Sequence, residues 1–145
     1  MKLTLLGTGC PSIDYKRCGS ANLICSKKTK ILVDCGSGVT QRLNQSGHSS
    51  AEIDALLLTH LHTDHVIDLY QHIISSWHSD RHSIWKIYGP KGTKKFVDQI
   101  FLAWKDERNL RISYEKRKSI KALKYKVFEF NKTGSINIKD IKFKY

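Results

Sequence analysis

The stretch "IDALLLTHLHTDHVID", residues 53–68, decides the fold of this chain. It begins with a continuous apolar run, which is typical of a short strand buried on both faces. A group of three histidines and one aspartate follows, and beyond it apolar residues recur at the three- and four-residue spacing of an amphipathic helix. The stretch therefore predicts a buried strand over residues 53–59, a polar loop, and a helix from Val66 to Trp77.

The polar loop carries four side chains of the kinds that bind metal ions. His60, His62, Asp64 and His65 form the pattern H-x-H-x-D-H. In extended backbone, side chains two residues apart point the same way, so His60 and His62 can face one ion. Asp64 and His65 follow the turn toward the helix and can face a second ion. Imidazole and carboxylate suit Zn²⁺, with Mn²⁺ and Fe²⁺ as alternatives. The pattern indicates a two-metal site suited to phosphodiester hydrolysis; the alternative is a histidine-rich loop formed by chance.

The segments on either side supply further strands and helices. We expect strands at residues 2–7, 21–25, 30–36 and 83–90, and a run of strands with a turn at residues 132–135 within the alternating segment 110–145. We expect helices at residues 37–47, ended by a glycine, and at residues 96–104. Strands come first, then strands and helices alternate, and strands return at the end. This order predicts an α/β fold with a mixed sheet.

Composition restricts the class of protein. The length of 145 residues suits one domain, and no apolar run is long enough for a transmembrane helix. The amino terminus lacks a secretory apolar region, so we expect a cytoplasmic protein with no membrane partner. The four cysteines form no C-x-x-C pair and are expected to be reduced thiols.

Positive charge is concentrated in the second half of the chain. The net charge is +12, and residues 105–126 hold nine basic and three acidic residues. A basic surface attracts polyanions, so nucleic acid is a natural partner. The alternative is that lysine is simply used heavily throughout this chain.

Three further motifs complete a family pattern: "LLGTG", "ILVDCGSG" and "IYGPKG" stand in this order around the histidine loop. Together they resemble the metallo-β-lactamase superfamily, in its ribonuclease Z-like and arylsulfatase-like branches. The resemblance implies an αββα sandwich with a mixed sheet, of which this chain forms the N-terminal portion. It implies that His60 and His62 bind a first Zn²⁺ and that Asp64 and His65 bind a second. Asp64 would also accept a proton during hydrolysis.

Two other carboxylates bear on this implied site. Asp34, in "LVDCG", would lie beneath the metal loop and orient a ligand. The alternative for Asp34 is a strand-end turn residue with no role at the site. Asp68 stands where the superfamily usually has glycine, in H-x-H-x-D-H-x-x-G. A carboxylate there favours the N-terminus of the next helix and changes the charge near the metals.

The resemblance also implies ligands that this chain does not supply. Superfamily members provide a third histidine, a bridging aspartate and a final histidine from later strands, so we expect residues 1–145 to form a metallo-β-lactamase-like domain without these later strands. Two protein ligands for each ion are fewer than a catalytic zinc generally has. We therefore expect weak zinc binding, little activity and a tendency to form homo-oligomers. In such an oligomer, His72, His78 or His82 would serve as surrogate ligands.

The function implied is that of a zinc-dependent hydrolase. The ribonuclease Z-like branch implies a phosphodiesterase, an endoribonuclease that acts on RNA at the 3′ ends of tRNA precursors. One alternative is an arylsulfatase-like or small-phosphodiester hydrolase, which would act on a small phosphodiester or sulfate ester. A different alternative is a truncated, non-catalytic remnant with weak metal or RNA binding.

Overall fold

A six-stranded mixed sheet organises the chain, for which a computed structural model describes residues 1–145. The strand order is β1-β2-β3-β4-β5-β6. The first three strands are antiparallel, and β3 to β6 run parallel to one another. The strands are β1 (Lys2–Gly7), β2 (Ala21–Cys25), β3 (Lys30–Val33), β4 (Ala55–Leu57), β5 (Trp85–Pro90) and β6 (Tyr125–Phe130). The predicted α/β class with a mixed sheet is confirmed.

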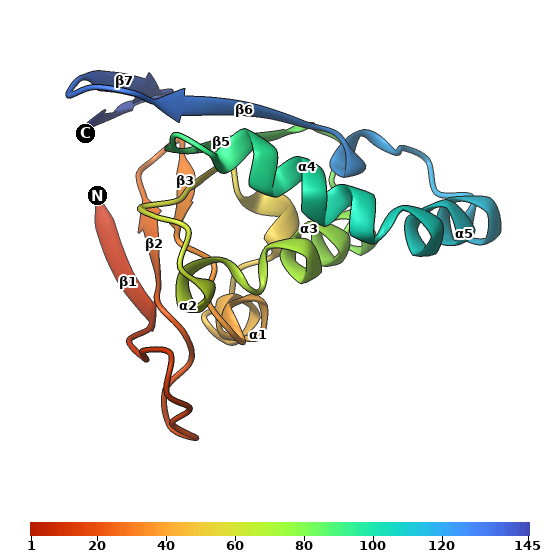
Figure 1. Cartoon of the computed structure of the whole chain (residues 1–145), viewed down its shortest axis with the longest axis horizontal. Coiled ribbons are helices and arrows are strands. Elements are labelled where there is room, and N and C mark those ends of the chain that lie inside the picture. The colour runs from red at the N-terminus through yellow and green to blue at the C-terminus, as the bar shows by residue number, and fades with distance from the viewer.

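The helices gather on one side of the curved sheet (Figure 1). They are α1 (Val39–Gln45), α2 (Thr63–Val66), α3 (Leu69–His78), α4 (Thr93–Ala103) and α5 (Lys105–Glu115), with short 3₁₀ turns η1 (Ser50–Glu52) and η2 (Lys121–Leu123). Their apolar faces meet the sheet in a core of 21 buried residues, among them Trp77 and Trp85. Burying one large apolar side chain fully contributes about 1.5–3 kcal/mol, so this core holds the strand ends rigidly. None of the helices combines the length and hydropathy needed to cross a bilayer.

The other face of the sheet carries a β-hairpin, which is seen at the upper left of Figure 1. It is formed by β7 (Ser135–Ile138) and β8 (Ile141–Lys144). Ile138 and Ile141 are buried against Ile31 and Tyr88 of the sheet. On the edge strand β1, Leu3 and Leu5 stay exposed. One sheet with its helical layer is therefore formed, and the opposite face is covered only in part.

Two predicted elements are shorter or interrupted. The strand expected over residues 53–59 spans only Ala55–Leu57, because η1 precedes it and the histidine loop follows. The helix expected from Val66 to Trp77 is divided into α2 and α3 by a break at Ile67 and Asp68. The apolar spacing runs through the break, so periodicity alone could not reveal it.

The prediction of strands throughout residues 110–145 is wrong for its first part. Residues 110–115 are helical and end α5, whereas β6, β7, β8 and the turn near residue 133 follow as expected. α5 has no buried residue, and its Leu110 and Tyr114 are exposed. A helix that buries so little lacks the regular apolar stripe by which helices are recognised in a sequence.

Candidate metal centre

Parallel pairing of β3 with β4 brings the functional residues to one edge of the sheet. Val33 at the end of β3 lies opposite Leu57 at the end of β4. Asp34 follows the first strand directly, and His60 and His62 follow the second. The carboxyl ends of parallel strands are where sites form in α/β folds.

The four predicted ligands lie together at this edge. The ring centroids of His60 and His65 are 3.9 Å apart, and those of His60 and His62 are 4.6 Å apart. Oδ2 of Asp64 is 3.5 Å from Nε2 of His65. Two donors bound to one tetrahedral zinc at about 2.0–2.1 Å lie roughly 3.3 Å from each other. The spacing of Asp64 and His65 therefore suits a shared ion.

The complete donor set for one ion is smaller than a closed site requires. No three His, Cys, Asp or Glu side chains are arranged to hold a single ion together. The available donors are imidazole nitrogens and a carboxylate, which are chemically suited to zinc. The residues therefore fit a divalent ion in kind, and their division into two donors for each of two ions stays a prediction.

Asp34 lies directly under this cluster. Its side chain is 3% exposed, and Oδ2 accepts a hydrogen bond from Nδ1 of His65 at 2.8 Å. Its backbone has a φ of 61°, a left-handed conformation that aspartate tolerates better than most residues. Because Nδ1 of His65 carries the shared proton, its Nε2 keeps a lone pair that faces Asp64. This is the contact expected of an orienting carboxylate; its role toward a metal stays a prediction.

Thr59, which was not among the residues predicted for the site, belongs to the same network. Its hydroxyl lies 3.0 Å from Nδ1 of His60 and 2.9 Å from Oδ2 of Asp34. The only signal in the sequence was its position directly before the first histidine. A threonine after a strand is too common for its role to be identified from the sequence alone.

Close backbone packing fixes the start of α2. The loop after β3 approaches so closely that a Cβ added at Gly36 would lie 2.2 Å from the carbonyl oxygen of Asp64. In addition, the amide of Cys35 donates to the carbonyl oxygen of His65 at 2.6 Å. Only glycine can occupy position 36 without displacing Asp64. The rigid loop after β3 therefore sets the position of both α2 ligands.

The cysteines take no part in the cluster. All four are free thiols, and Cys35 is the buried one. Burial first, and then the nearby carboxylates of Asp68 and Asp34, raise the pKa of Cys35 well above its usual range. Cys35 is therefore a neutral packing residue at neutral pH.

Asp68, which replaces the superfamily's glycine, supports a different helix from the one expected. It is the N-cap residue of α3, but its side chain makes no capping bond to that helix. Instead, its Oδ2 accepts a hydrogen bond from the amide of Thr40, in the first turn of α1, at 2.7 Å. The N-cap of α1 is Gly38, which has no side chain to offer. Asp68 thus satisfies an otherwise free amide of α1.

The three histidines expected as surrogate ligands differ in accessibility. His72 is fully buried, so the expectation that it could serve a partner subunit is wrong. Nε2 of His78 faces Glu115 at 3.0 Å, and only His82 is exposed. His72 lies on the buried face of α3, three residues after the buried Leu69.

A groove of about 490 Å³ lies beside the loop, between α2–α3 and α4–α5. Leu61 and Thr63 of the histidine loop line one end of it, and Arg111 of α5 lines the other. Tyr70 and Trp104 stack within it at a centroid distance of 5.2 Å. Tyr70 lies on α3 and Trp104 lies in the turn between α4 and α5, so their pairing could not be read from the sequence.

The fold and the arrangement of the histidine loop define this chain as a protein of the metallo-β-lactamase fold. Its structure resembles that of the metallo-β-lactamase fold protein YhfI from Bacillus subtilis, with a TM-score of 0.69 and 20% identity over 97% of this chain and 49% of that one. It also resembles the short form of human tRNase Z, with a TM-score of 0.67 and 26% identity over 89% of this chain and 44% of that one.

The family described as Anti-Pycsar protein Apyc1 matches residues 1–145, and the chain belongs to this family. It is also similar to curated proteins named ribonuclease Z. The protein from Mycolicibacterium gilvum is 40% identical over 118 residues, which are 79% of this chain and 41% of that protein. The protein from Mycobacterium marinum is 38% identical over 117 residues, or 79% of this chain and 42% of that protein. The resemblance to the superfamily and its ribonuclease Z-like branch is confirmed.

The chain spans about two-fifths of the length of these ribonuclease Z relatives, as the shares of 41% and 42% show. The matched part includes the histidine loop and its supporting strands. What the complete relatives do is therefore carried to this chain only as a proposal.

Proposed function

We propose that this chain forms part of a divalent-metal-dependent phosphodiesterase of the ribonuclease Z type. His60 and His62 would hold one ion, and Asp64 and His65 would hold the other. The observation that carries the proposal is the pairing of Asp64 and His65, whose donor atoms lie 3.5 Å apart above a buried carboxylate. That spacing suits two ligands of one ion.

The chemistry divides between the ion and the chain. Zn²⁺, or Mn²⁺ or Fe²⁺ in its place, would acidify a water molecule and polarise a phosphoryl oxygen. The chain orients its imidazoles through Nδ1, which leaves Nε2 as the donor atom on His60 and on His65. Asp64 would also accept a proton at its carboxylate during hydrolysis.

RNA is the proposed substrate, at the 3′ ends of tRNA precursors. Support comes from the relatives named ribonuclease Z and from the likeness to human tRNase Z. The basic segment 105–126 adds an electrostatic argument, because phosphate contacts supply much of the affinity for nucleic acid. The cytoplasmic location and self-association expected from the sequence stay predictions.

Hydrolysis of a small phosphodiester is the second candidate function. It is favoured by the family match, which spans the whole chain and whose name, Anti-Pycsar protein Apyc1, does not refer to RNA. The two candidates share the metal loop and differ in what surrounds the scissile phosphate. Substrate comparison therefore separates them.

The test begins with zinc binding, measured by competition with a chromophoric chelator. We expect weak binding that His60→Ala reduces further, because each ion has only two ligands from this chain. Hydrolysis is then measured with a tRNA precursor that carries a 3′ trailer and with bis(p-nitrophenyl) phosphate. We expect low turnover that requires zinc and His60.

His48→Ala is the matched control, because it removes a partly exposed histidine that lies outside the cluster and faces Glu52. Cleavage of the precursor at its 3′ side supports the ribonuclease function, whereas turnover of the small diester alone supports the second candidate. Zinc binding that is unchanged in His60→Ala would overturn the proposed site. Zinc binding without hydrolysis of either substrate would identify a non-catalytic protein.

A further inference from the structure

Thr59 lies between the buried carboxylate of Asp34 and the first histidine of the cluster. Its amide donates to Oδ1 of Asp34 at 2.8 Å. Its hydroxyl lies 3.0 Å from the same oxygen and 2.9 Å from Oδ2. On its other side, the hydroxyl is 3.0 Å from Nδ1 of His60. One side chain thus contacts both the carboxylate and the imidazole.

The directions of these hydrogen bonds follow from the number of protons. A carboxylate can only accept, so the single hydroxyl proton of Thr59 is donated to Asp34. Toward His60 the hydroxyl oxygen must then accept, and Nδ1 of His60 must carry a proton. A neutral imidazole protonated on Nδ1 has its lone pair on Nε2. That is the nitrogen left to bind an ion.

His65 reaches the same state without an intermediary. Its Nδ1 donates directly to Oδ2 of Asp34 at 2.8 Å, which also leaves its lone pair on Nε2. Asp34 therefore acts on His65 directly and on His60 through Thr59. In the proposed site, these two histidines belong to different ions.

We propose that Thr59 is a positioning residue that transmits the orienting effect of Asp34 to His60, so that one carboxylate sets the tautomer of one ligand at each ion. This inference rests on the metal site of the proposed function but not on its substrate. It predicts unequal effects: loss of the Thr59 hydroxyl changes the tautomer of His60 and leaves the tautomer of His65 unchanged.

The local structure allows a clean substitution at this position. Thr59 is exposed, so replacing it leaves no cavity in the core. Valine has the shape of threonine without the hydroxyl, whereas serine keeps the hydroxyl without the methyl group. Thr63, in the same loop, is also exposed and makes no side-chain hydrogen bond in the structure, so Thr63→Val is the matched control.

The experiment records nitrogen-15 NMR spectra of the imidazoles in the metal-free chain at about pH 8, where an ordinary histidine is neutral. We expect both His60 and His65 to carry their proton on Nδ1. In Thr59→Val, His60 loses this single tautomer while His65 retains it, and Thr59→Ser restores the original spectrum. Zinc affinity, measured in parallel, should fall about 10-fold or more in Thr59→Val, as for other residues that orient metal ligands.

An unchanged tautomer of His60 in Thr59→Val would overturn the inference, and so would equal changes in His60 and His65 or in the Thr63→Val control. The two proposals fail separately. If the tautomer of His60 changes in Thr59→Val but the original chain does not bind zinc, the metal site is refuted and the positioning role of Thr59 is retained. If the original chain binds zinc tightly but the tautomer of His60 is unchanged in Thr59→Val, the metal site is retained and the positioning role of Thr59 is refuted.

Discussion

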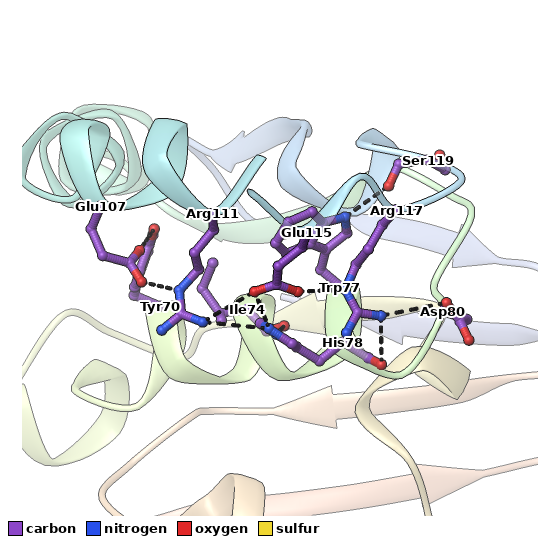
Figure 2. Close-up of polar contacts among 10 residues, drawn as sticks. All are labelled: Tyr70, Ile74, Trp77, His78, Asp80, Glu107, Arg111, Glu115, Arg117 and Ser119. Carbon is purple, nitrogen blue, oxygen red and sulfur yellow. Dashed lines mark hydrogen bonds and ion pairs between the residues drawn. The ribbon is translucent and has the colours of Figure 1, made fainter. Parts of the chain in front are cut away.

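Nε2 of His78 lies 3.0 Å from Oε1 of Glu115, and this contact joins α3 to α5 (Figure 2). Glu115 also accepts hydrogen bonds from Arg111 and Arg117. Because α5 has no buried residue, these polar contacts contribute much of what fixes its position. The hydrogen bond from Arg117 first, and then that from His78, lower the pKa of Glu115 to about 2.

Glu115→Gln should loosen α5 while leaving the core intact, because it removes the charge that the arginines contact. We expect faster amide exchange in residues 105–115 and little change in the thermal midpoint. Since the folded pKa of about 2 lies below the ordinary 4.5, the stabilisation is present above pH 4.5 and lost as the pH falls toward 2. Asp106→Asn, on the same helix but outside these contacts, is the control. Unchanged exchange in Glu115→Gln would show that apolar contacts hold α5.

Asp68→Ala should destabilise the fold through α1, not through α3, because it leaves the amide of Thr40 without an acceptor. Loss of a helix cap costs about 0.5–2 kcal/mol. Asp68→Asn keeps an oxygen acceptor and should retain most of that stability. Urea denaturation of the three proteins measures the difference. Equal losses in the alanine and asparagine variants would assign the effect to the charge and not to the hydrogen bond.

The histidine loop was readable from the sequence because its chemistry is local. Four potential ligand residues within six positions need no long-range information, and the apolar run before them identifies β4. The link from Asp34 to His65 spans 31 positions and depends on the pairing of β3 with β4. Family resemblance indicated Asp34, whereas the only signal for Thr59 was its position before His60, and its role follows from the hydrogen-bond geometry.

The errors in the predicted secondary structure have a common physical origin. α5 was missed because none of its residues is fully buried, and periodicity registers only apolar burial. The break between α2 and α3 was missed because Asp68 bonds to Thr40, 28 positions away. Asp68 was expected to favour its own helix, whereas tertiary contact made it a cap for another.

The buried His72 should make stability depend on pH below neutrality. Burial first, and then the nearby Arg81, lower its pKa from 6.5 to about 3. The unfolded chain therefore binds a proton that the folded chain cannot. The stability is fully present above pH 6.5 and is lost as the pH falls toward 3, with a loss of about 2 kcal/mol already at pH 5.

His72→Phe removes this titration, so its unfolding free energy should fall by about 2 kcal/mol less than that of the original chain between pH 8 and pH 5. Urea denaturation at the two pH values measures both slopes, whatever the absolute stability of the variant. The exposed His82→Asn serves as the control and should keep the original slope. Identical slopes for His72→Phe and the original chain would mean that His72 does not titrate on unfolding.

The final prediction concerns where RNA binds. Within the basic segment 105–126, Arg111 and Arg117 already pair with Glu107 and Glu115, whereas several lysines are exposed and free of ion pairs. Exposed lysines neutralise phosphates without reading sequence, and each such contact steepens the dependence of log K on log salt by about 0.7 on single strands. Replacing Lys116, Lys118 and Lys121 by serine should therefore weaken RNA binding and lower the salt slope by up to about 2.

Fluorescence anisotropy with a labelled tRNA precursor at several salt concentrations measures affinity and slope together. The control triple replaces Lys27, Lys142 and Lys144, which are also exposed and lie on the β2–β3 turn and on β8, at the opposite end of the molecule from α5 (Figure 1). Because both variants lose three positive charges, a net-charge effect would reduce affinity equally in the two. A larger loss in the first triple assigns binding to the segment 105–126. Equal losses, or an affinity that does not change with salt, would remove the electrostatic support for RNA as the substrate.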